Sequence, residues 1–233
     1  MANKTKSSNI VVGLDIGTSK VVCIVGKFVE DNLEIIALGA YPSSGLKKGV
    51  VVNIDATTDA ISKAVEQAQS MVEEKIKSVF VGIAGNHIKS LNSQGAVGIK
   101  DKEVTSYDID RVIDSAQAVS IPSDQRVLHV LPQEFVIDGQ EVSLDPLGMS
   151  GVRLEAKVHL VTCSNSAIKN IEKCIKNCGL GVQGFVLEQL ASSHSILSDD
   201  EKDLGVCLVY IGVGTTDIAI FNSGSIVFTG VIP

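Results

Sequence analysis

Two short segments near opposite ends of the chain repeat one pattern, in which an apolar strand enters a glycine turn and a second strand leaves it. Residues 14–21 read LDIGTSKV, and residues 209–218 read VYIGVGTTDI, which matches the first copy after a two-residue insertion. Such a repeat constrains the architecture, because each copy must be built from a strand, a turn and a strand. Glycine and hydroxyl residues in these turns offer backbone N–H groups and side chains that can hold a phosphate.

The hydrophobic periodicity between the two copies predicts alternating strands and helices. Strands are predicted at residues 10–14, 21–28, 33–41, 79–84, 126–137, 152–162, 182–186, 204–211 and 215–222, with a short extended segment at 47–53. Helices are predicted from Asp55 or Thr57 to about Glu74, from Thr105 or Ser106 to before Pro122, from Ser164 or Asn165 to Cys178, and over 188–197, followed by an exposed charged turn at 198–203. This order predicts an α/β fold.

Composition excludes several classes of function. The net charge is -7, with no basic block beyond Lys4 and Lys6, so nucleic acid is not an expected partner. Five cysteines without a secretory signal predict a reduced, cytoplasmic compartment. Cys174 and Cys178 stand four residues apart, which places two small apolar side chains on one helix face and argues against zinc.

The middle of the chain has a different character from its flanks. Residues 85–164 are more polar and carry a strand and helix pattern of their own, which predicts an inserted α+β subdomain. The flanking segments 10–84 and 165–233 would then form one discontinuous domain. Residues 1–9 are polar and predict a flexible tail.

The first turn suggests metal and phosphate chemistry. Asp15 ends an apolar strand directly before the glycine turn, so it could hold Mg²⁺ through water. A single glycine turn between strands is common and is by itself more simply structural. The second copy favours function, because two such hairpins from two halves of a chain can face each other across a polyphosphate.

Particular blocks resemble a known family. The motifs GLDIGT at 13–18 and GVGTTD at 212–217 resemble the two phosphate loops of the superfamily that contains actin, a heat-shock chaperone and sugar kinases. The blocks RVLHVLPQEF at 126–135, DPLGMSGVRL at 145–154 and KVHLVT at 157–162 are similar to the FtsA family of bacterial cell-division proteins. This resemblance runs from about residue 10 to residue 233.

The resemblance implies an actin-like ATPase domain, a ribonuclease-H-like mixed five-stranded sheet with helices, that carries the inserted subdomain. It implies a scaffold that self-assembles, binds ATP with Mg²⁺ and links FtsZ filaments to the cytoplasmic face of the inner membrane at the division site. The implied phosphate-binding residues are Asp15, Gly17, Thr18, Ser19, Lys20, Gly212, Gly214, Thr215, Thr216 and Asp217. Asp15 and Asp217 are the implied metal contacts. Glu188 is the implied catalytic carboxylate, although an ordinary carboxylate at a helix start is an equal alternative.

The chain departs from the family pattern at two positions and in length. Tyr210 replaces an aspartate of the second loop, and Val213 adds a Cβ where the backbone should approach phosphate or take a positive φ. Both changes predict a weak ATPase at most. The family continues beyond Pro233 into a second domain, so the FtsZ-binding region and the membrane helix are expected there, outside these residues.

Residues 85–164 are the expected contact surface for later division proteins and for self-association. Two other functions stay open on the sequence. One is a small-molecule kinase of the same superfamily, which would need the second domain and a substrate-facing carboxylate. The other is an actin-like pilus-assembly adaptor, whose inserted subdomain is similarly placed.

Overall fold

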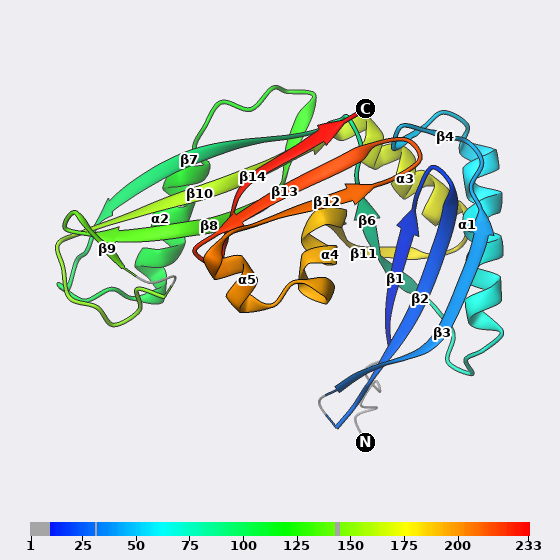
Figure 1. Ribbon diagram of the computed structural model, residues 1–233, viewed down its shortest axis with the longest axis horizontal. Coiled ribbons are helices and arrows are strands. Elements are labelled where there is room, and N and C mark those ends of the chain that lie inside the picture. The colour runs from blue at the N-terminus through cyan, green and yellow to red at the C-terminus, as the bar shows by residue number, and fades with distance from the viewer. Residues whose placement is uncertain (1–9, 31, 143–144) are drawn as a thin grey trace, which may run out of the picture. The chain divides into compact units, whose positions relative to one another are not determined.

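The structure, a computed structural model, describes residues 10–30, 32–142 and 145–233 (Figure 1). The predicted tail at 1–9 therefore lies outside the described residues. The chain folds as two compact units, each assembled from separate segments. The first unit contains the segments up to Gly85, Ala167–Glu188 and Gly212–Gly214. The second unit contains Asn86–Ser166, Gln189–Ile211 and Thr215–Pro233. Because compact units and evolutionary domains need not coincide, the predicted domain boundaries stay a prediction.

A mixed five-stranded sheet forms the centre of the first unit, as expected from the sequence. Its order is β11-β6-β1-β2-β3, in which β11, β6 and β1 are parallel and β2 and β3 are antiparallel to their neighbours. The strands are β1 (Ile10–Ile16), β2 (Lys20–Val29), β3 (Asn32–Pro42), β6 (Ser78–Ile83) and β11 (Gly181–Leu187). Since the carboxyl ends of parallel strands meet at one edge, that edge gathers the residues that follow β1, β6 and β11.

Helix α1 (Ile54–Gln69) packs closely against β2 and β3. A Cβ added to Gly39 of β3 would lie 2.0 Å from the Ala64 carbonyl oxygen, so the helix approaches the strand at a distance that only glycine allows. The helix is capped by Asn53, whose side chain accepts a hydrogen bond from the Ala56 N–H at 3.0 Å. The predicted caps, Asp55 and Thr57, lie inside the first turn instead, and the helix ends before Glu74.

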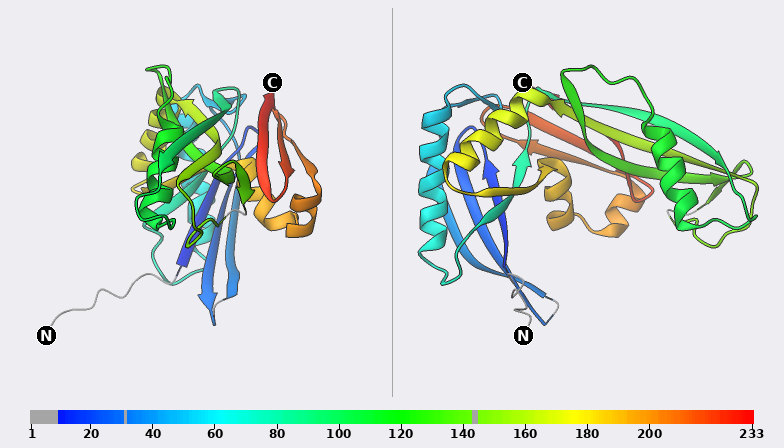
Figure 2. Two further views of the ribbon diagram at one scale, coloured as in Figure 1. Left: turned by 90° about the vertical axis from the view of Figure 1, so that its left-hand side faces the viewer. Right: turned by 180° about the vertical axis from the view of Figure 1, so that it is seen from behind.

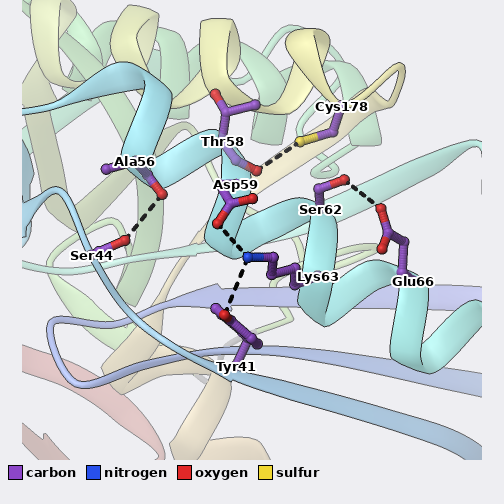
Figure 3. A network of polar contacts seen from close by, with 9 residues as sticks. All are labelled: Tyr41, Ser44, Ala56, Thr58, Asp59, Ser62, Lys63, Glu66 and Cys178. Carbon is purple, nitrogen blue, oxygen red and sulfur yellow. Dashed lines mark hydrogen bonds and ion pairs between the residues drawn. The ribbon is translucent and has the colours of Figure 1, made fainter.

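Helix α3 (Asn165–Asn177) confirms the interpretation of the two neighbouring cysteines. Cys174 is fully buried, and its Sγ contacts the Ile54 carbonyl oxygen at 3.7 Å, while Cys178 Sγ contacts the Thr58 carbonyl oxygen at 3.4 Å. Figure 3 shows Cys178 meeting α1 in this way, beside the exposed Lys63–Asp59 ion pair of 2.8 Å. Both thiols therefore serve helix packing.

A small hairpin replaces the extended segment predicted at 47–53. Its strands are β4 (Leu46–Lys47) and β5 (Val50–Val51), and Lys48 and Gly49 form the turn with φ of 51° and 76°. A Cβ on Gly49 would lie 2.5 Å from the Ala84 carbonyl oxygen, directly after β6. The hairpin is thus seated at the carboxyl edge of the five-stranded sheet.

The second unit contains an antiparallel four-stranded sheet, in the order β7-β10-β8-β9, and helix α2. These elements are β7 (Ile88–Gly98), β8 (Gln125–Ile137), β9 (Gln140–Val142), β10 (Arg153–Ser164) and α2 (Ser106–Gln117). One face of the sheet packs on α2 through a core that includes Val112, Ala116, Val158 and Leu160. Thr105 and Asp108 cap the helix reciprocally, which confirms one of its two predicted starts.

A three-stranded antiparallel sheet and two short helices complete this unit. They are α4 (Glu188–Ile196), α5 (Asp199–Leu204), β12 (Val206–Ile211), β13 (Thr216–Asn222) and β14 (Ser225–Ile232). The prediction of a charged turn at 198–203 was wrong, because Ser198 and Glu201 form a reciprocal capping box that starts α5. Among the helices of the described residues, none is long and apolar enough to cross a bilayer.

Strand β14 contacts the four-stranded sheet on the face opposite α2, through polar groups (Figure 2). His159 is buried there between Asn92 Oδ1, 2.6 Å from its Nδ1, and Thr229 Oγ1, 2.9 Å from its Nε2. The Asn92 amide nitrogen donates to the Val227 carbonyl, which turns Oδ1 toward the ring. Nδ1 therefore carries the proton, and Nε2 accepts from the threonine hydroxyl.

Acid should weaken this contact. Burial lowers the pKa of His159 from 6.5 to about 4, so the unfolded chain binds a proton that the folded chain excludes. We expect the free energy of unfolding to fall by about 3 kcal/mol between pH 6.5 and pH 4 from this residue. Urea unfolding across that range should give a shallower pH dependence for His159→Gln. Some slope should remain, since burial also lowers the pKa of His87 and His129.

The matched control is His194→Gln, because His194 is exposed on α4. It should leave the pH dependence unchanged. Equal slopes for the wild type and His159→Gln would show that the buried imidazole does not govern acid sensitivity.

Candidate functional site

The first glycine turn joins β1 to β2 at the carboxyl edge of the five-stranded sheet. The Gly17 N–H donates to the Lys20 carbonyl at 3.1 Å, and the Ser43 N–H donates to the Ser19 carbonyl at 3.0 Å, so the turn is held at two points. A Cβ on Gly17 would lie 3.1 Å from the Lys20 carbonyl oxygen, which favours glycine at this position. Ser19 and Lys20 are exposed, and Thr18 is half-buried. The turn thus presents hydroxyls and a cation to solvent.

Asp15 and Glu188 meet beside this turn. Asp15 lies near the end of β1, Glu188 follows β11, and a side-chain hydrogen bond joins the two carboxyl groups. Burial raises the pKa of Asp15, whereas the charge of Lys20 and the hydrogen bond with Glu188 lower it by less. Asp15 Oδ1 is buried and has no hydrogen-bond partner among the described residues. A buried carboxylate oxygen without a donor is expensive unless a ligand satisfies it.

Gly82 allows the two carboxyl groups to meet. It lies on β6, the strand between β1 and β11, and a Cβ there would be 3.2 Å from Glu188 Cγ and 3.6 Å from its Oε1. The glutamate side chain therefore passes over the glycine to reach Asp15. Gly82 was not among the predicted site residues, although a glycine inside an apolar strand is a signal for close approach.

The second glycine turn, Gly212–Gly214, is also part of the first unit. A Cβ on Gly214 would lie 2.5 Å from Thr18 Oγ1 and 3.3 Å from Lys48 Cα. Three turns thus converge here, and only glycine fits at position 214. Val213 is 80% exposed and is not among the described residues with positive φ. Of the two expectations for this position, positive φ is therefore not found, and close approach to phosphate stays a prediction.

Thr215, Thr216 and Asp217 are assigned to the second unit, whereas the other predicted phosphate-binding residues are assigned to the first. Asp217 is 1% exposed, and its two oxygens accept hydrogen bonds from Gln189 Nε2 at 3.1 Å and from Thr215 Oγ1 at 2.9 Å. Tyr210 lies opposite Asp217 in the β12–β13 register. In this arrangement the Asp217 carboxylate fixes the turn through neutral donors.

The oxygen donors at the first turn fit Mg²⁺. Within the described ranges no group of three or more His, Cys, Asp and Glu side chains could hold a metal ion by itself. Mg²⁺ does not need one, because it keeps several waters and is commonly held by one or two carboxylates together with substrate phosphates. Asp15, with Glu188 beside it, supplies this kind of donor set.

The buried carboxyl should destabilise the folded chain at neutral pH. Burial raises the pKa of Asp15 by more than the charge of Lys20 lowers it. The folded chain therefore loses stability as the pH rises through the folded-state pKa of Asp15, because the carboxyl must then carry a charge that burial disfavours. Asp15→Asn should therefore raise the free energy of unfolding at pH 7 by about 1 kcal/mol. Asp101→Asn, at an exposed loop position, should change it little. Lower stability of Asp15→Asn in urea unfolding would show instead that attraction to Lys20 dominates.

Comparison with known sequences adds independent information. Residues 85–162 match the family model described as the SHS2 domain inserted in FtsA. The chain is 62% identical over 229 residues to the cell division protein FtsA of Pseudomonas aeruginosa, covering 98% of this chain and 55% of the relative. It is 44% identical over 231 residues to that of Escherichia coli K12, covering 99% and 55%. The chain therefore spans about half the length of the curated relatives it matches.

Solved structures share the fold at low sequence identity. A PilM–PilN type IV pilus biogenesis complex aligns with a TM-score of 0.70 at 14% identity, covering 95% of this chain and 61% of that one. The ethanolamine utilization protein EutJ from Carboxydothermus hydrogenoformans aligns with a TM-score of 0.54 at 14% identity, covering 97% and 52%. The fold is that of the actin-like ATPases. The sequence identities to the curated relatives show that the chain belongs to the FtsA family of cell division proteins.

Proposed function

We propose that this chain supplies one wall of an ATP–Mg²⁺ site within an actin-like cell-division scaffold. The observation that carries the proposal is the buried Asp15 Oδ1, left without a donor at the carboxyl edge of the sheet. Open α/β sheets bind ligands at this edge. A hydrated Mg²⁺ would satisfy that oxygen through a bound water, and its charge would neutralise part of the phosphate charge.

Different residues of this chain would then bind the phosphate groups and the metal ion. The backbone and hydroxyls of the Gly17–Lys20 turn would bind phosphate oxygens, and the Gly212–Gly214 turn, which contacts Thr18, would close over them. Asp15 would orient the metal-bound water. Thr215, Thr216 and Asp217 stay predicted phosphate-binding residues on sequence grounds, with Asp217 accepting a hydrogen bond from Thr215.

Glu188 fits a positioning role at the same site. Its hydrogen bond with Asp15 and its passage over Gly82 favour this role over that of a carboxylate that only starts a helix. A Mg²⁺ ion near Asp15 would favour the charged form of that carboxyl, and Glu188 could then orient an attacking water. Tyr210 takes the place of an aspartate of the family's second loop, and Val213 adds a side chain there. Nucleotide binding would therefore serve self-assembly more than ATP hydrolysis.

The wider role follows from family membership and is part of the same proposal. In the intact protein, regions beyond these residues would bind FtsZ and the cytoplasmic face of the membrane, and residues 85–164 would contact later division proteins and neighbouring subunits. A pilus adaptor is less well supported. The pilus complex is 14% identical to this chain, which shows the fold alone, whereas the cell-division relatives reach 62%.

Calorimetric titration of the 233-residue chain with ATP tests the site. We expect binding to be about tenfold tighter with Mg²⁺ than with EDTA, which corresponds to about 1.4 kcal/mol. Asp15→Asn should remove most of this difference, because an amide cannot attract a hydrated cation as a carboxylate does. Asp101→Asn is the control and should retain it. An undiminished Mg²⁺ effect in Asp15→Asn would exclude Asp15 as the metal contact.

A further inference from the structure

The β4–β5 turn brings a lysine to the candidate phosphate site. Gly49 is seated against the Ala84 carbonyl at the end of β6, and Lys48 Cα lies 3.3 Å from the point where a Gly214 Cβ would stand. That same point is 2.5 Å from Thr18 Oγ1. Lys48 is therefore a neighbour of both glycine turns, although it is distant from each in sequence.

The backbone at Lys48 takes a conformation that lysine rarely adopts. Its φ is 51°, and Gly49 follows with a φ of 76°, so both central residues of a two-residue hairpin loop have positive φ. Such loops strongly prefer asparagine or aspartate followed by glycine. Lysine has no short polar side chain to stabilise this backbone locally. Strain of this kind collects at functional sites, where a side chain is needed for another reason.

The charge of Lys48 is available to a ligand. The residue is exposed, and within the described part of the chain its ammonium has no ion-pair or hydrogen-bond partner. Lys20, the other cation at these turns, lowers the pKa of Asp15 through its charge and so interacts with that carboxylate. A phosphate chain bound between the turns could therefore pair with the ammonium group of Lys48, whereas the charge of Lys20 also interacts with Asp15.

We propose that Lys48 binds the phosphate chain of the nucleotide. The inference rests on the proposed function and deepens it, since it adds a third turn to the two phosphate loops. A lysine ammonium on a flexible stem acts as a point charge toward phosphate oxygens. Lys47 is also exposed, but it lies on β4 before the turn and makes a matched comparison.

The test compares three variants of the 233-residue chain by calorimetry with MgATP and with magnesium tripolyphosphate. Lys48→Asn removes the charge and suits the positive φ, so its melting temperature should equal or exceed that of the wild type. We expect it to weaken binding of both probes about fivefold, and to reduce the loss of affinity between 50 and 200 mM salt. Lys48→Arg keeps the charge and should restore binding to within about twofold. Lys47→Gln should bind like the wild type.

The outcomes separate the inference from the proposed function. Wild-type affinity in a stable Lys48→Asn chain would overturn the role of Lys48 and leave the nucleotide site standing. An equal loss in Lys47→Gln would reduce the effect to general surface charge and would also overturn it. If the wild-type chain binds neither probe, both the proposed nucleotide site of this chain and the role of Lys48 fail.

Discussion

The parallel pairing of β11, β6 and β1 is the constraint on which the site depends. Parallel strands place their carboxyl ends together, so Asp15 and Glu188 meet although they are far apart in sequence. The Lys48–Gly49 turn reaches the same edge by resting on the residues after β6. If β11 ran antiparallel to β1, Glu188 would lie at the opposite edge of the sheet from Asp15, and the two carboxyl groups could not meet.

The site is arranged against the stability of the empty chain. Asp15 is half-buried and its Oδ1 is buried without a hydrogen-bond partner among the described residues. Asp15 and Glu188 bring two carboxyl groups together, and Lys48 has a positive φ. In the proposed site, these features would become favourable with a ligand that brings positive charge to the carboxyl groups and negative charge to the lysine. Ligand binding would therefore stabilise the fold as well as fill the site, by an amount that grows with ligand concentration.

Elements marked by a long apolar repeat or by a glycine turn were predictable from the sequence. Apolar periodicity predicted the individual strands and the glycine turns located strand ends, whereas the mixed five-stranded sheet was expected from the family resemblance. Short elements were not predictable in the same way. The two-residue strands of β4–β5 carry no periodicity, and Lys48 contradicts the usual chemistry of its turn. Helix α5 is a run of charges whose helical state depends on the Ser198–Glu201 box. The role of Gly82 depends on Glu188, which follows the neighbouring strand β11 but lies far away in sequence.

In the contact between β14 and the four-stranded sheet, the sheet contributes mainly side-chain donors and β14 contributes mainly main-chain acceptors. Ser90, Asn92 and Gln133 contribute side chains, whereas β14 largely presents the main-chain carbonyls of Ile226, Val227 and Thr229. A carbonyl is common to every amino acid, so these three acceptors place no demand on the side chains of β14. Two other contacts do depend on side chains, because the Thr229 hydroxyl bonds to His159 and the Ser225 hydroxyl donates to the Gln133 carbonyl. A change of side chain would therefore be tolerated more readily at Val227 than at Ser225 or Thr229.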